Sequence, residues 1–219
     1  HQLVLEGLFG AAEKVVSTKE LIDKKTLANL KIKCITLKHP PIRERMTYAE
    51  ELDYLVSKES RNNFILELCN NITGNTLCLF QLVEKHGKIL YDGMKEKENV
   101  YFVYGGTDTD QREKIRGLVE GHKNSTTIAS YGTFSTGINI RNINNIVLAS
   151  PSKSKIRVLQ SIGRGLRTSS TKDSILIFDI ADDVSYKERR NFTLNHFFER
   201  INIYNQEQFN YEISKVKIK

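Results

Sequence analysis

A basic segment near residue 160 has residue types and a spacing that suit phosphate groups. Four polar side chains follow one another at intervals of 3, 4 and 3 positions: Arg157, Gln160, Arg164 and Arg167. On an α-helix these intervals keep all four within about 80° of one face. Each planar guanidinium donates two parallel hydrogen bonds to a phosphate and keeps its charge. Because no acidic residue lies between positions 153 and 167, the pattern favours phosphate binding over a salt-bridged surface helix.

Two glycines lie inside the same expected helix. Gly163 and Gly165 each cost on the order of 1 kcal/mol of helix stability relative to alanine. Close approach of a ligand or of another chain segment is the usual reason for such a glycine. The two glycines therefore support the binding interpretation of this segment.

Two other loops contain groups that could bind phosphates. Residues 131–139 are rich in glycine and hydroxyl side chains, which could hold phosphates or sugar hydroxyls, although an ordinary polar turn has the same composition. Gly105 and Gly106 end an expected strand, and Arg112 lies in the first turns of the next helix, where free amides and the helix dipole favour anions. A capped surface helix would also explain this second loop.

The elements that must position these loops alternate between strand and helix. Apolar runs predict strands at 76–80, 99–106, 126–130, 143–150 and 173–183, and amphipathic patterns predict helices at 81–94, 108–121 and 153–167. This alternation is typical of an α/β fold with a parallel sheet covered by helices on both faces. Ligands of such sheets bind at the carboxyl ends of the strands, where all three loops would lie.

The flanking segments predict further elements. They are a helix at 18–25, a strand from residue 30, a helix from 48 to about 71 with an interruption near residue 60, a tail helix from 186 to about 205 and an edge strand at 208–218. A capping box of Thr47 and Glu50 marks the start of the second helix. Asp179, Asp182 and Asp183 are expected to cap the tail helix or to pair with basic residues rather than to bind a metal.

Charge and composition restrict the classes of function. The 219 residues include 33 basic and 26 acidic ones, and the segment 151–172 alone contains six basic residues and no acidic one. Such a block suits nucleic acid, nucleotide phosphates or an acidic membrane surface. Three distant cysteines argue against a disulfide framework or a zinc site. Since no apolar run reaches the roughly 18 residues of a membrane span, we expect a soluble, cytoplasmic protein without a membrane partner or a metal site.

The motifs together resemble those of superfamily-2 helicases. The run from Gln160 to Arg167 resembles their motif VI, Q-x-x-G-R-x-x-R, and the run from Ser130 to Asn139 resembles their motif V. The strand at 76–80 with Gln81 resembles motif IV, and the stretch from Gly106 to Arg112 resembles the element after it. A more specific resemblance is to the second half of the recombination helicases of T-even bacteriophages. It rests on the order of GLFG at 7–10, LKIKCITL at 30–37, HGK at 86–88, ASYGTFSTGI at 129–138, SKIRVLQSIGR at 154–164 and FNYE at 209–212.

The resemblance implies the second of two RecA-like domains, with a parallel sheet between helices and a helical C-terminal tail. Arg164 and Arg167 would reach the γ-phosphate of ATP held on the first domain, with Arg167 as the arginine finger. The resemblance places four other residues at the nucleotide: Gln160, Gly163, Gly137 and Asn139. It places six residues at the tracked DNA strand: Gln81, Gly106, Arg112, Ser130, Thr133 and Arg157.

The implied function is that of the C-terminal motor domain of an ATP-dependent DNA helicase or translocase acting on branched DNA, such as forks and junctions, in recombination and repair. The sequence contains no G-x-x-x-x-G-K-[ST] loop and no D-E-x-H or D-E-x-D box. ATP and Mg²⁺ would then be bound mainly by an N-terminal RecA-like domain of the same protein, and we expect this chain to be a fragment that is inactive alone. The expected divisions are an inter-domain linker with a leading helix and strand at 1–41, the second RecA-like domain at 42–184 and the tail at 185–219.

Two alternatives remain open from the sequence. A stand-alone nucleic-acid-binding module would bind DNA tightly in a salt-sensitive manner without any ATPase role. A complete α/β enzyme on a flavodoxin-like or other doubly wound sheet would use the loop 131–139 as a phosphate cradle. ATP hydrolysis by the chain alone would favour the second alternative.

Overall fold

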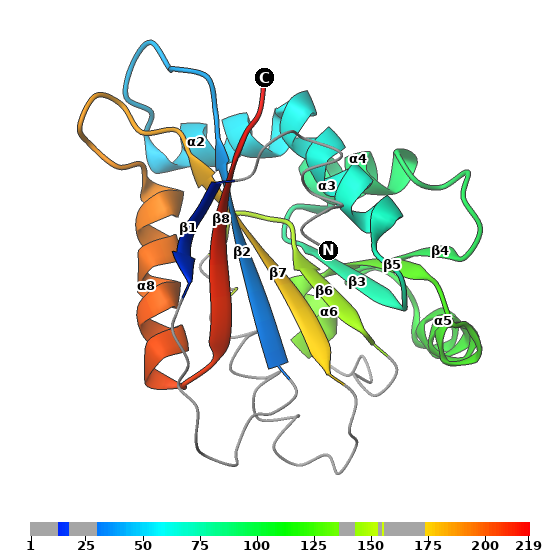
Figure 1. Cartoon of the computed structure of the whole chain (residues 1–219). Helices are drawn as coiled ribbons and strands as arrows, with labels where there is room; N and C mark the ends of the chain where they lie inside the picture. The colour runs from blue at the N-terminus through cyan, green and yellow to red at the C-terminus, as the bar shows by residue number, and fades with distance from the viewer. Residues whose placement is uncertain (1–12, 18–29, 136–142, 153–154, 156–173) are drawn as a thin grey trace.

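The computed structural model describes residues 13–17, 30–135, 143–152, 155 and 174–219 (Figure 1). Eight strands form one sheet: β1 (Glu13–Ser17), β2 (Leu30–Lys38), β3 (Thr76–Phe80), β4 (Val100–Val103), β5 (Thr126–Ser130), β6 (Asn145–Leu148), β7 (Ile175–Asp183) and β8 (Asn210–Lys217). Their order across the sheet is β1-β8-β2-β7-β6-β3-β5-β4. Every neighbouring pair is parallel except β1 with β8.

Helices cover both faces of this sheet, as the alternation of strands and helices predicts (Figure 1). The helices are α2 (Tyr48–Ser57), α3 (Glu59–Asn71), the π-helix η1 (Val83–Gly87), α4 (Lys88–Asp92), α5 (Thr109–Gly121), α6 (Tyr131–Ser135) and α8 (Phe192–Gln206). Apolar side chains of α3 and α4 pack on one face, and those of α5 and α8 pack on the other. The central strands β3, β5 and β6 are buried along their whole length, which is the pattern of parallel strands covered on both sides.

The N-terminal caps show how local sequence starts two of the helices. The predicted capping box is confirmed, because the Thr47 side chain accepts from the backbone of Glu50 and the Glu50 carboxylate accepts from the backbone of Thr47. The helix predicted at 108–121 is α5, and the carboxylate of Asp108 caps it by accepting from the backbone N–H of Gln111 at 2.7 Å. The break between α2 and α3 falls at Lys58, two residues before the expected interruption.

Three expected elements differ from the structure. The tail helix begins at Phe192 rather than at Tyr186, because residues 186–189 form a tight turn closed by two backbone hydrogen bonds. The strand β8 is not at the edge of the sheet, since β1 pairs with its outer side. The first part of the expected loop 131–139 is the short helix α6. The helix expected at 18–25 and most of the one at 153–167 lie outside the described residues, and Lys155 is helical.

The start of α8 is held by a side chain from a distant helix. The side-chain oxygen of its N-cap residue, Asn191, accepts from the backbone of Val184 and from no backbone N–H of the helix. Instead, the buried carboxylate of Glu51 in α2 accepts from the backbone N–H groups of Phe192 at 2.9 Å and Thr193 at 2.7 Å. It also accepts from the Asn191 amide and the Thr193 hydroxyl. This carboxylate therefore satisfies the free amides of α8 and joins α8 to α2.

Within the described part of the chain, no helix combines the length and the apolarity that crossing a membrane requires. The expected divisions at 41 and 184 stay predictions. Strands from all three expected segments belong to the same sheet.

Candidate functional site

The sheet brings the carboxyl ends of β3, β4, β5 and β6 together on one side of the molecule. The parallel register aligns Phe80 at the end of β3 with Ser130 at the end of β5, and Leu79 with Leu148 of β6. Val103 of β4 is aligned with Ala129 of β5. The loops that follow these strands therefore meet at a common edge, which is where ligands of parallel sheets bind.

Gln81, predicted at the DNA strand, is exposed at this edge and is held by two serines from the end of β6. Its backbone N–H donates to Oγ of Ser150 at 3.0 Å, and the hydroxyl of Ser152 donates to its side-chain oxygen Oε1. The Ser150 hydroxyl also lies 2.7 Å from Nδ1 of His86. The side-chain oxygen of Gln81 is thus bound by Ser152. The N–H groups of its side-chain amide are donors from which a phosphate oxygen could accept hydrogen bonds.

His86 is a buried neutral imidazole beneath this loop. Burial, with a smaller effect of Arg61, lowers the pKa of His86 to about 3. The Ser150 oxygen accepts from the backbone of Gln81, its hydroxyl makes a second hydrogen bond with Nδ1 of His86, and the other ring nitrogen of this histidine is Nε2. Among the described residues this Nε2 has no hydrogen-bond partner. The histidine positions Ser150, and we assign it no catalytic role.

The second predicted loop, after β4, is ordered by Arg112. Its Nη2 donates to the backbone carbonyls of Gly105 at 3.0 Å and Tyr104 at 3.3 Å. A Cβ at Gly106 would lie 2.6 Å from the Tyr104 ring, so this glycine is required for the ring to pack over the loop. The structure thus shows Arg112 fixing the loop, and its predicted contact with DNA stays a prediction.

The third loop, after β5, places Ser130 and Thr133 in direct contact. Their hydroxyl oxygens are 2.7 Å apart, and the backbone N–H of Thr133 donates to Oγ of Ser130 at 3.3 Å. Both residues are buried. Ser130 therefore caps α6, which explains why this segment is helical where the sequence predicted a polar loop. Their predicted contacts with the DNA backbone are untested.

The remaining predicted residues lie outside the described part of the chain. They are Gly137, Asn139, Arg157, Gln160, Gly163, Arg164 and Arg167. Their roles at ATP and DNA stay predictions.

A buried ionic cluster, whose partners sequence reasoning did not identify, connects Lys155 of the basic segment 151–172 to β7 and α8. Nζ of Lys155 donates to the carbonyl oxygen of Ile180 at 2.5 Å and lies 3.2 Å from Oδ1 of Asp179. The same carboxylate accepts two bonds from Arg200 of α8, at 2.7 and 3.0 Å, and one from the Tyr204 hydroxyl at 2.7 Å. Burial opposes ionisation of Asp179, yet Arg200 and Lys155 hold the pKa of its carboxyl below the ordinary value.

A second buried ionic cluster connects α3 to β7 and to the residue after β6. Arg61 donates to both carboxylate oxygens of Asp182, at 2.8 and 3.0 Å, and to the carbonyl of Ala149 at 2.6 Å. His39 lies 2.9 Å from the same carboxylate. Burial opposes ionisation of Asp182, but Arg61 and His39 hold the pKa of its carboxyl well below the usual range.

The ion pairing predicted for the three aspartates is therefore confirmed, and Asp183 lies 3.7 Å from Lys38. All three belong to β7, within the strand predicted at 173–183. Among the described residues, no group of three or more His, Cys, Asp or Glu could hold a metal.

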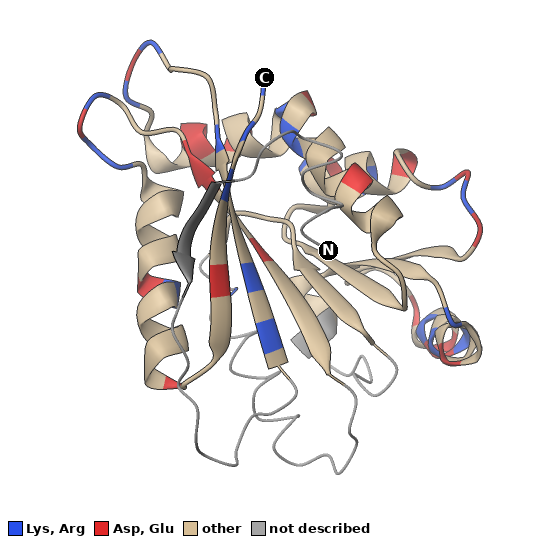
Figure 2. Cartoon of the chain, in the orientation of Figure 1, with Lys and Arg blue, Asp and Glu red and all other residues tan. Residues whose placement is uncertain are grey.

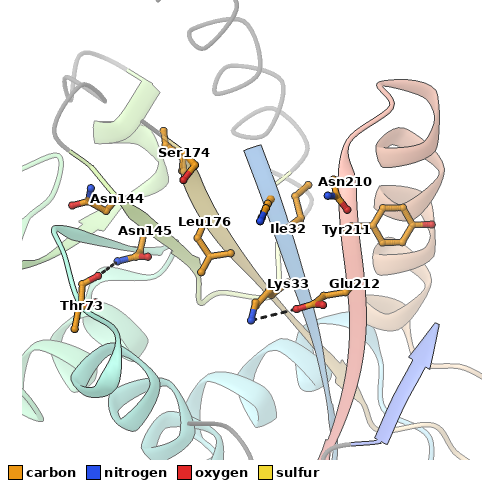
Figure 3. Close-up of a pocket in the computed structure, with 12 residues that line it drawn as sticks. Ile32, Lys33, Thr73, Asn144, Asn145, Ser174, Leu176, Asn210, Tyr211 and Glu212 are labelled. Atoms are coloured by element: carbon orange, nitrogen blue, oxygen red, sulfur yellow. Dashed lines mark hydrogen bonds and ion pairs between the residues drawn. The ribbon is translucent and has the colours of Figure 1, made fainter. Parts of the chain in front are cut away.

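The opposite edge of the sheet contains a polar hollow of about 520 Å³ (Figure 3). It lies at the amino ends of β2, β7 and β8, and Lys33 pairs with Glu212 there at 3.3 Å. Of the residues predicted for ATP or DNA, none that the structure describes lines it. The hollow is thus separate from the candidate site.

Comparison with known proteins identifies the family. The family model of the helicase conserved C-terminal domain matches residues 57–169, which is more than half of the chain. The chain belongs to the helicase C-terminal domain family. Every residue predicted for ATP or DNA lies in the matched range, from Gln81 to Arg167.

Several helicases are similar to this helicase C-terminal domain. The ATP-dependent DNA helicase uvsW of Enterobacteria phage T4 is 35% identical over 230 residues, which cover 97% of this chain and 46% of the phage protein. The crystal structure of T4 UvsW matches with a TM-score of 0.77 over 88% of this chain and 42% of that chain, also at 35% identity. This chain thus spans less than half the length of the phage helicase.

Two more distant matches show the fold. The C-terminal domain of the DEAD-box protein Dbp5 has a TM-score of 0.53 at 13% identity and covers 88% of this chain and 91% of that domain. The yeast DEAD-box splicing factor Prp28 has a TM-score of 0.55 at 13% identity, covering 87% of this chain and 36% of that one. The expected RecA-like parallel sheet with helices on both faces is confirmed.

Proposed function

We propose that this helicase C-terminal domain is the second motor domain of an ATP-dependent DNA helicase or translocase that acts on branched DNA in recombination and repair. The observation that carries the proposal is the 35% identity to the phage T4 DNA helicase over 97% of this chain. The convergence of Gln81, Arg112 and Ser130 at one sheet edge supports it. Host cytoplasm is the corresponding location if the protein is encoded by a phage.

In this proposal, ATP and Mg²⁺ are bound mainly by an N-terminal RecA-like domain of the same protein. Arg164 and Arg167 approach the γ-phosphate when the two domains close, and Arg167 stabilises the charge that develops during phosphoryl transfer. Gln160, Gly163, Gly137 and Asn139 line the nucleotide. Closing and reopening alternate the grip of the two domains on the DNA strand.

The DNA contacts proposed for this domain are non-specific. Gln81, the loop at Gly106 and Arg112, the pair Ser130 and Thr133, and Arg157 contact the backbone of the tracked strand. Phosphate contacts fix position without reading sequence, as movement along DNA requires. The ordered loops support this role, because Ser150 and Ser152 position Gln81 and Arg112 holds the glycine loop.

Replacing Arg167 with Ala in the full-length protein tests the proposal. We expect ATP turnover to fall by about 10³-fold or more, since an arginine finger is typically worth that factor, while DNA affinity changes little. The control is Arg116→Ala, which removes an exposed arginine of α5 paired with Glu113. Unchanged ATP turnover in Arg167→Ala would refute the finger assignment and favour a nucleic-acid-binding module.

A further inference from the structure

Two loops that are distant in sequence form one surface beyond the carboxyl ends of β2 and β7. Residues 39–47 join β2 to α2, and residues 184–191 join β7 to α8. Side chains of both loops line a single narrow crevice: Ile42, Arg45 and Met46 from the first, and Tyr186, Arg189 and Arg190 from the second. Figure 2 shows basic residues on both loops, at the upper left.

The basic loop surface, as we define it, consists of six exposed residues: Lys38, Arg43, Arg45, Lys187, Arg189 and Arg190. The same loops and strand ends contain three acidic residues, Glu44, Asp183 and Glu188, so six minus three leaves a net charge of +3. Only Lys38 pairs with a carboxylate among the described residues. The arginines and Lys187 therefore repel one another, which an anionic partner would relieve.

Two of the arginines, Arg45 and Arg190, are stacked on aromatic rings before any partner binds. The guanidinium of Arg190 lies 4.3 Å from the centre of the Phe198 ring, and that of Arg45 lies 5.7 Å from the centre of the Phe192 ring. Stacking on an aromatic face leaves the N–H groups of a guanidinium available to an anion. Because fewer rotamers are lost on binding, the entropic cost of a phosphate contact is reduced.

The turn between the arginines is also fixed. The backbones of Tyr186 and Arg189 exchange hydrogen bonds of 3.1 and 3.0 Å, and Lys187 has a φ of 53°. This left-handed conformation is unfavourable for a lysine and is typical of functional turns. The closed turn holds Lys187 and Arg189 close together.

We infer that the basic loop surface binds the phosphate backbone of DNA, as a contact additional to the predicted strand path. β2 and β7 are parallel to β6 and β3 in one sheet, so the surface lies along the same edge as Gln81 and Ser130. DNA bound at the ends of β3 and β5 would extend toward it. This inference rests on the proposed function, which makes DNA the polyanion.

The test compares two quadruple variants of the full-length protein. One combines Arg43→Gln, Arg45→Gln, Arg189→Gln and Arg190→Gln. The matched control removes four exposed lysines elsewhere: Lys31→Gln, Lys97→Gln, Lys114→Gln and Lys123→Gln. Fluorescence anisotropy with forked and single-stranded DNA is measured from 50 to 200 mM salt, and thermal unfolding verifies that both variants fold.

We expect the arginine variant to bind DNA about 10- to 100-fold more weakly at 50 mM salt, and its slope of log affinity against log salt to be shallower by about 2 to 4. ATP turnover at saturating DNA should stay unchanged, while the DNA concentration for half-maximal turnover should rise. An affinity and slope equal to the parent's, or an equal loss in the control, would overturn the inference. Neither of these DNA-binding results changes the outcome expected for ATP turnover in Arg167→Ala. Failure of the inference can therefore be distinguished from failure of the proposed motor function.

Discussion

Lys155 is a charged side chain in the protein interior, and the ionisation of this lysine should make stability depend on pH. Burial lowers the pKa of Lys155 to about 7, with Asp179 opposing the shift, whereas an unfolded lysine has a pKa of about 10.4. Between these values the unfolded chain holds a proton that the folded chain has released. The free energy of unfolding should therefore rise with pH, by up to about 1.4 kcal/mol per unit from pH 7. Below pH 7 both states hold the proton, and the contribution is constant.

The variant Lys155→Met removes this ionisation without leaving Asp179 unpaired, because Arg200 and Tyr204 still bind the carboxylate. Urea unfolding at pH 7, 8 and 9 should show the parent gaining stability relative to Lys155→Met as the pH rises. Lys97→Met, at an exposed position, should follow the parent. Parallel pH curves for parent and Lys155→Met would contradict the expectation.

The sequence could not predict this cluster. The three side chains that bind Asp179 lie 21 to 25 positions from it in the chain, and each is an ordinary polar residue by itself. The segment 151–172 contains basic residues and no acidic partner for them, but the partner of Lys155 is Asp179 in β7, outside that segment. Pairing across elements depends on the register of the sheet and on how α8 packs. A local sequence pattern contains neither the register of the sheet nor the packing of α8.

Glu51 joins two elements, and its removal should destabilise both. The carboxylate accepts four hydrogen bonds at the start of α8, including those from the backbone of Phe192 and Thr193. Glu51→Gln keeps the shape but loses the negative charge at the helix N-terminus and turns an amide toward donors. We expect a loss of about 1 to 3 kcal/mol in the free energy of unfolding.

Urea denaturation measures this loss, with Glu67→Gln as the control, because Glu67 is an exposed residue of α3. The control should stay within about 0.5 kcal/mol of the parent, as exposed substitutions usually do. A Glu51→Gln variant as stable as the control would show that the carboxylate does not hold the start of α8.

The same contrast between local and distant contacts explains which elements were predictable. Thr47 and Glu50 are three positions apart, so the start of α2 follows from sequence alone. The start of α8 depends on Glu51, more than 140 positions away, and was predicted six residues too early. β8 has the alternation of an edge strand, but β1 pairs beyond it. α6 replaced a predicted loop because Ser130 and Thr133 bind each other.

At the scale of the whole molecule, the sheet order determines which loops meet. β3, β4 and β5 are separated along the chain, yet the order β6-β3-β5-β4 brings their carboxyl ends side by side. The sequence predicts that the loops share an edge because parallel strands require it. It does not predict that the basic loops 39–47 and 184–191 also meet, since that depends on β2 lying beside β7. The basic loop surface is thus a consequence of strand order.

The 219-residue chain alone should not hydrolyse ATP, because the proposed arginines act on a triphosphate bound by another domain. The chain spans 46% of the length of the phage T4 helicase and contains no G-x-x-x-x-G-K-[ST] loop. We expect phosphate release by the purified chain at the level of a protein-free control, with or without forked DNA. The full-length protein, assayed in parallel, should hydrolyse ATP and be stimulated by DNA. DNA-stimulated hydrolysis by the chain alone would contradict the two-domain motor and favour a complete α/β enzyme.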